Sequence, residues 1–251
     1  MKKRLIKNIA QAFGAIAFLV GVWIAAWAAV GNELLVPSFS DSVKAFFSLF
    51  INGGFWKGFL QSLSRVAIAF CISFVFAAAL AVVAYLYPAF AKFFAPIAAV
   101  IRSMPVLAVL LIVLVWTGAG VAPVVVAFLS LFPLLYTGTL SALKGIDGEL
   151  IEMSRVYRVG LKTRIAALYL PNIAPQTLRQ AGAALAFGVK LVVSAEVLSR
   201  TAGSLGNMMQ DAQIFSEMPL LFALVAVACA AGFLFETAGE AAARALERRW
   251  R

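Results

Sequence analysis

Histidine is absent from this 251-residue sequence, and cysteine occurs only twice. Without histidine, the chain can have neither His-based acid–base catalysis nor His metal ligands. Cys71 and Cys229 each lie in a long apolar segment, so we expect two small buried hydrophobic residues rather than a disulfide or a metal site. No catalytic residue and no metal ligand is predicted, which disfavours a membrane enzyme.

Charge is also scarce, because only 13% of the residues are charged while 63% are hydrophobic, and the mean hydropathy is +0.97. A water-soluble domain of this size could not cover so much apolar surface. Several segments reach the roughly 20 apolar residues that cross a bilayer. We therefore predict an all-α, polytopic membrane protein in which residues 1–251 form a single domain. Its expected spans are residues 9–30, 66–87, 94–117, 122–143, 181–198 and 219–235.

The net charge of +10 is distributed unevenly between the two sides of the predicted membrane. With the amino terminus in the cytoplasm, the outer side receives only Lys44, Lys57 and Arg200. The cytoplasmic side receives Lys2, Lys3, Arg4, Lys7, Lys92, Lys144, Arg155, Arg158, Lys162, Arg164, Arg179, Arg244, Arg248, Arg249 and Arg251. This positive-inside bias places both termini in the cytoplasm and explains the basic excess without a nucleic-acid partner.

The densest charge lies between residues 149 and 171, ELIEMSRVYRVGLKTRIAALYLP, with apolar segments on either side. Lipid cannot accept such a segment, so it should lie in the cytoplasm. Helical spacing places Leu150, Met153, Ser154 and Tyr157 on one face, and Glu149, Glu152 and Arg155 on another. Asp147 or Gly148 can cap the start of this helix and Gly160 offers a stop, which predicts a short docking helix with two faces.

At these residues the sequence resembles the "EAA" loop of ABC importer permeases. Glu152 takes the acidic position, Met153 and Ser154 stand at the two alanines, and Leu168, Leu170 and Pro171 match the closing element. The glycine of the pattern falls on Arg158, and a glycine follows two residues later at Gly160. Further similarity to the nitrate/sulfonate/taurine-type branch extends in order over about residues 35 to 248. It includes residues 35–38, 62–65, 102–105, 116–120, 190–196 and 203–206.

The resemblance implies a type I ABC importer permease in the bacterial inner membrane, with a cytoplasmic coupling loop at residues 144–180. Two permease copies, expected to form a homodimer, would make the path for a small solute. Cytoplasmic ABC ATPase subunits would grip the coupling helix and carry ATP and Mg, and an extracytoplasmic binding protein would deliver the solute. This chain itself has no phosphate-binding Gly-x-x-x-x-Gly-Lys-Ser/Thr loop, so it should bind no cofactor.

Four residues are candidates for the path or its gate. Arg102 and Pro105 interrupt the third predicted span, either as an ordinary proline kink or as part of the path. Lys190 and Glu196 lie in the fifth span, where charge should face protein or water. Six residues apart on a helix, they are poor partners for each other, so each should pair elsewhere. Lys190 is either an attractor of anionic substrate or a structural or snorkelling lysine.

Other functions remain open at this stage. Arg102, Lys190 and Glu196 could form the coupling relay of a secondary carrier or channel that works without ATP, although this leaves the two-faced cytoplasmic segment unexplained. Without the resemblance, a structural assembly factor would also fit. Within the ABC family, the substrate could be a sulfonate, taurine, nitrate, a vitamin precursor or another ring compound.

Overall fold

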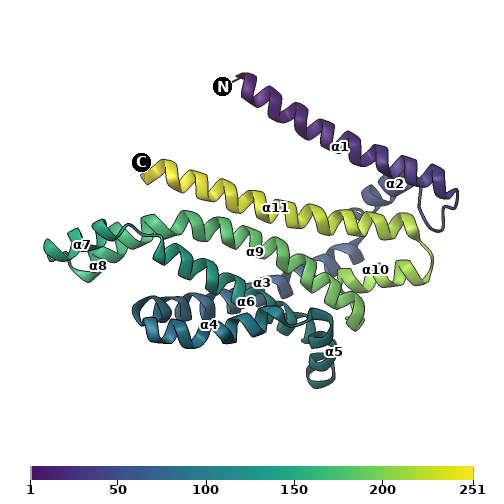
Figure 1. The fold of residues 1–251 in the computed structure, drawn as a ribbon. Helices are drawn as coiled ribbons and strands as arrows, with labels where there is room; N and C mark the ends of the chain where they lie inside the picture. The colour runs from purple at the N-terminus through teal and green to yellow at the C-terminus, as the bar shows by residue number, and fades with distance from the viewer. Residues whose placement is uncertain (1, 251) are drawn as a thin grey trace.

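The computed structural model describes the backbone of residues 2–250 and, within the first helix, the burial of Gly14 and the side chains from residue 17 onward. All of its regular elements in this range are helices (Figure 1). The first predicted span, residues 9–30, lies within helix α1, Lys2–Val30. Of that span, the side chains of residues 9–13, 15 and 16 lie outside the described residues, as do Met1 and Arg251 entirely.

Four helical stretches in the described range are long and apolar enough to cross a membrane. A fifth span results if one bent pair of helices is counted, and the apolar part of α1, Ala17–Val30, is shorter. The expected count of about six is therefore approximate. The four stretches are α3, Gly53–Leu86; α6, Ala122–Lys144; the run Leu161–Ser199, which comprises α8 (Leu161–Arg164), the π-helix η1 (Ile165–Tyr169) and α9 (Leu170–Ser199); and α11, Met218–Trp250.

The bent pair replaces the third predicted span. Helices α4, Pro88–Ser103, and α5, Val106–Thr117, meet at an angle of 89°. Met104 and Pro105 between them have extended backbones, because proline lacks an N–H and disfavours the helical conformation in the residue before it. The predicted interruption at residues 102–105 is confirmed. The alternative of an ordinary proline kink is wrong, since the helix ends and the chain turns (Figure 1).

Helix α9 packs against both α6 and α11, and α3 packs on α6 and α9. Among the candidate spans, the run Leu161–Ser199, which contains α9, has the largest buried share, with 56% of its apolar window inside the protein. Gly182 of α9 and Gly239 of α11 touch backbone to backbone, since a Cβ atom on Gly182 would lie 2.9 Å from the Cα of Gly239. Small residues permit this close approach of two helices.

Shorter helices cover the two ends of the bundle. On the predicted outer side lie α2, Phe39–Leu49, and α10, Leu205–Ile214, and on the predicted cytoplasmic side lies α7, Gly148–Val156 (Figure 1). Helix α11 continues well past the predicted end of its span, and Glu240 pairs with Arg244 at 3.6 Å as its spacing suggests.

The cysteine prediction is partly wrong. Cys71 and Cys229 are free, as expected, but both side chains are exposed on the outer faces of α3 and α11 rather than buried. In a membrane protein, apolar spans are apolar all round, so hydropathy cannot separate the lipid-facing residues from the core.

Candidate functional site

The charged segment folds as a short helix that projects from one end of the bundle (Figure 1). Asp147 caps the start of α7, and its side chain accepts a hydrogen bond from the backbone N–H of Glu149 at 2.9 Å. Glu149 lies in the first turn and Arg155 in the last, so both charges complement the helix dipole. The predicted cap at Asp147 is thereby confirmed.

The end of α7 differs from the prediction. The helix stops at Val156, and Arg158 takes the left-handed conformation with φ 49°. The N–H of Val159 donates to Ser154 O and the N–H of Arg158 donates to Arg155 O, each at 3.0 Å. These two bonds define a Schellman motif, in which glycine is the favoured left-handed residue. The stop is therefore at Arg158, the glycine position of the resembled pattern, and the prediction of a stop at Gly160 is wrong.

Each face of α7 borders a hollow. Ser154 is buried, while Leu150, Met153 and Tyr157 line an apolar hollow of about 540 Å³ that continues onto α8 and η1. On the opposite side, Glu152 and Arg155 line a second hollow of about 580 Å³. In the described part of the chain, no charged residue of α7 forms an ion pair, so its charges are free for another molecule.

The segment then returns to the bundle as one continuous helical stretch. Leu170 and Pro171 begin α9, and η1 precedes them as a single π-helical turn. Pro171 cannot donate to the carbonyl one turn before it, and a local change to the wider π-helix accommodates such a missing bond. Residues 161–199 thus form a continuous helical connection from the end of α7 to the outer end of α9.

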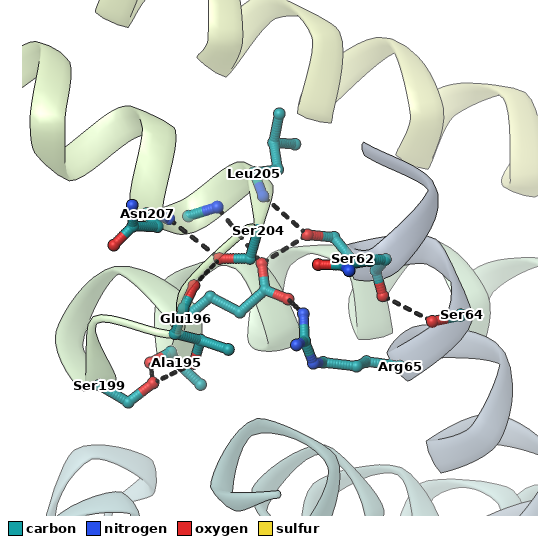
Figure 2. Close-up of polar contacts among 12 residues, drawn as sticks. Ser62, Ser64, Arg65, Ala195, Glu196, Ser199, Ser204, Leu205 and Asn207 are labelled. Atoms are coloured by element: carbon teal, nitrogen blue, oxygen red, sulfur yellow. Dashed lines mark hydrogen bonds and ion pairs between the residues drawn. The ribbon is translucent and has the colours of Figure 1, made fainter. Parts of the chain in front are cut away.

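Glu196 is a buried charge whose carboxylate is hydrogen-bonded on both oxygens. Its side chain has no exposed surface, and it accepts hydrogen bonds from Arg65 Nη1 at 2.8 Å and Ser62 Oγ at 2.6 Å (Figure 2). The backbone N–H of Gly206 lies at 3.3 Å from the same carboxylate. The expectation that Glu196 pairs with another helix is confirmed. Ser62 and Arg65 were not predicted as its partners, although an arginine inside a span needs a counter-charge and therefore signals one.

This cluster also organises the outer loop after α9. Ser62 Oγ accepts from the N–H of Leu205 at 2.9 Å, and Ser204 caps α10 by accepting from the N–H of Asn207 (Figure 2). Thr201 donates to Ala119 O at 2.7 Å, and this bond attaches the turn between α5 and α6 to the loop after α9. Glu196 therefore fixes the outer ends of α3, α9 and α10 in relation to one another.

The other candidate path residues are not brought into this cluster. Lys190 is exposed on another face of α9, and Arg102 is exposed in the last turn of α4. Neither residue forms an ion pair within the part of the chain that the structure describes. Pro105 begins α5 and is exposed.

Lys190 belongs to a single uncovered stripe of α9, which also carries amide and hydroxyl side chains. The stripe advances in alternating steps of four and three residues, so its members share one helix face. It consists of Gln176, Gln180, Ala183, Phe187, Lys190 and Ser194, all exposed except for the half-buried Gln180. By contrast, the exposed residues in the middle of α3 are apolar and suit lipid: Ile68, Ile72, Val75, Phe76 and Val82.

An open cavity of about 470 Å³, accessible from the protein surface, lies at the α7-proximal end of the stripe, between α6, α9 and α11. Gln180 crosses one wall and donates to Leu134 O at 2.8 Å, and its amide occupies the space that a side chain on Gly138 would need. The polar and charged lining residues are Thr137 and Ser141 from α6, Gln176, Arg179 and Gln180 from α9, and Glu236 and Glu240 from α11.

The family model described as "Binding-protein-dependent transport system inner membrane component" matches residues 73–251. The taurine transport system permease protein TauC of Escherichia coli is 24% identical over 98% of this chain and 90% of its own length. The putative aliphatic sulfonates transport permease protein SsuC of Bacillus subtilis is 27% identical over 93% of this chain and 86% of its own length.

A solved structure shares the fold. A chain of the MetNI methionine ABC transporter, in inward-facing conformations, superposes with a TM-score of 0.64. It is 21% identical, and the match covers 75% of this chain and 94% of that chain.

Proposed function

We propose, from the premise that this chain belongs to the family of binding-protein-dependent transport system inner membrane components, that it is the permease subunit of an ATP-driven importer. It is a membrane protein and a transport subunit rather than an enzyme. Its solute is a small compound of the sulfonate or taurine type, as the names of its relatives suggest.

The observation that carries the ATP-driven assignment is the geometry of α7. A charged helix with two accessible faces, unpaired charges and a hollow on each side fits a surface that another protein grips. In this proposal the cytoplasmic ATPase binds ATP and Mg and contacts Glu149, Glu152 and Arg155 on the charged face. Met153 and Tyr157 fill part of the partner's groove.

The remaining coupling residues transmit the motion. Ser154, Arg158 and Gly160 set the turn after α7, and Leu170 and Pro171 begin the helix that leads to the path. Because residues 161–199 form one helical stretch, a displacement of α7 is carried along α9 to the Glu196 cluster. We assign Glu196 a positioning role in this cluster rather than direct contact with solute.

The translocation path runs along the exposed stripe of α9. Lys190 cannot remain uncompensated in lipid, so its face meets water or the second permease copy of a homodimer. Lys190 then supplies the positive charge that attracts an anionic solute. Arg102 and Pro105, at the turn between α4 and α5, lie beside the path as part of its gate. Both termini face the cytoplasm, and an extracytoplasmic binding protein delivers the solute.

Co-purification with a co-expressed cytoplasmic ABC ATPase tests the assignment. The wild-type permease should retain the ATPase in detergent, and Glu152→Lys should lose most of it, because a charge reversal at a protein contact opposes the partner's surface. Lys57→Glu, the reversal of an exposed charge near the start of α3 at the opposite end of the bundle, is the matched control and should retain the ATPase. If the wild type captures no ATPase, or if both variants behave alike, the proposed coupling surface is wrong.

A further inference from the structure

The cavity between α6, α9 and α11 contains a carboxylate that the rest of the molecule does not neutralise. Glu236 is an exposed residue that lines this open cavity, and no lysine or arginine among the described residues lies within ion-pairing distance of it. Its carboxylate also accepts no hydrogen bond from the described side chains or backbone. The neighbouring residues of α11 on the exterior, Phe233 and Leu234, are exposed and apolar, as a span that borders lipid requires.

Among the residues that the structure describes, Arg179 is the one cation that lines the cavity, and it is already paired. Arg179 pairs with Glu247 and lies 3.8 Å from Glu240, and Glu240 is shared with Arg244. Arg179 therefore links α9 to α11. Its guanidinium is already paired with carboxylates of α11, so it is not available to neutralise Glu236 or to bind an anion. The charge of the cavity that has no partner is therefore the negative charge of Glu236.

Neutral hydrogen-bonding groups complete the lining. Gln180 uses its amide nitrogen on Leu134 O, so its amide oxygen remains as an acceptor. Gln176 and the hydroxyl of Ser141 lie on the same wall. Carboxylate, amide oxygen and hydroxyl are acceptors for an N–H donor with a positive charge, and ammonium offers three such donors.

We propose that this cavity is a binding site for a small solute that carries an ammonium group, with Glu236 as its counter-ion. A volume of about 470 Å³ suits a solute of several heavy atoms. The proposal rests on the proposed function in placing the site on the path, at one end of the stripe that carries Lys190. A solute with a sulfonate at one end and an ammonium at the other can pair its sulfonate with Lys190 and, further along the path, its ammonium with Glu236. A simple sulfonate can pair only with Lys190.

Two probes that differ only in the relevant group provide the test. 2-Aminoethanesulfonate and 2-hydroxyethanesulfonate are nearly the same size, and only the first has an ammonium. Saturation-transfer NMR on the purified full-length permease in nanodiscs, at millimolar probe, measures binding directly. We expect the amine to bind and Glu236→Gln to weaken that binding by about tenfold or more, the size expected for the loss of a hydrogen bond to a charged group.

Glu217→Gln is the matched control, because Glu217 is an exposed carboxylate just before α11 and outside the cavity. It should bind the amine as the wild type does, and the weak binding of the hydroxyl probe should be the same in all three proteins. Absence of amine binding to the wild type, equal binding of the two probes, or equal losses in the two variants would each overturn the site. ATP-driven uptake is measured separately, so that the importer assignment can fail while the site stands, and the reverse.

Discussion

Arg65→Met should destabilise this protein far more than the loss of a surface ion pair does. Glu196 is wholly buried and accepts from Arg65 at 2.8 Å, from Ser62 at 2.6 Å and from the Gly206 N–H at 3.3 Å. Removal of the arginine leaves two neutral donors on a carboxylate that has no access to water. Breaking a buried pair in this way costs about 3–5 kcal/mol, because the remaining charge is uncompensated.

Thermal unfolding of the detergent-purified variants measures this loss. Arg65→Met/Glu196→Gln removes both charges and should recover at least half of the stability lost in the single variant, since a buried pair contributes much less than either unpaired charge costs. Lys44→Met breaks the exposed pair with Asp41 at 3.0 Å and should leave the unfolding temperature unchanged. The reasoning is refuted if Arg65→Met unfolds like the wild type, or if the double variant is no more stable than the single one.

Three further changes test other parts of the structure. Arg158→Gly should stabilise the end of α7 by about 1 kcal/mol, because glycine adopts a φ of 49° without a Cβ penalty, and slower amide exchange in α7 would measure it; unchanged or faster exchange argues against the Schellman turn. Gly182→Val should lower the unfolding temperature, because its Cβ would lie 2.8 Å from Phe235 O, and such overpacking costs about 1–3 kcal/mol. Gly53 has open space around it, so Gly53→Ala should leave the unfolding temperature unchanged. Equal effects of the two changes would rule out close α9–α11 packing. Lys190→Met should reduce uptake of anionic solutes more than of neutral ones, and an unchanged preference would remove Lys190 from solute selection.

The sequence alone was sufficient for features that depend on local chemistry. Hydropathy identified α3, α6, α9 and α11, and the charge and capping residues located α7 and its start at Asp147. The break before Pro105 also followed from the chemistry of one residue. These features are encoded by neighbours in the chain, so a pattern in one segment is enough to predict them.

Features that depend on packing could not be predicted in this way. The partnership of Glu196 with Arg65 joins residues 131 apart, and hydropathy is blind to which of many arginines approaches a buried acid. The sequence predicts the stop after α7 at Gly160, because glycine is favoured at helix ends, but the chain turns at Arg158 at a modest conformational cost. The stripe on α9 emerges only when α3, α6, α10 and α11 have covered its other faces.

ATP-dependent uptake into proteoliposomes tests the central claim most directly. The permease is reconstituted with its ATPase and binding protein, and solute uptake is followed with wild-type ATPase, with an ATPase that cannot hydrolyse ATP, and without any ATPase. The account predicts uptake only in the first case, and its loss when the permease carries Glu152→Lys. Uptake of equal rate without the ATPase would contradict it and would identify the chain as a self-sufficient carrier.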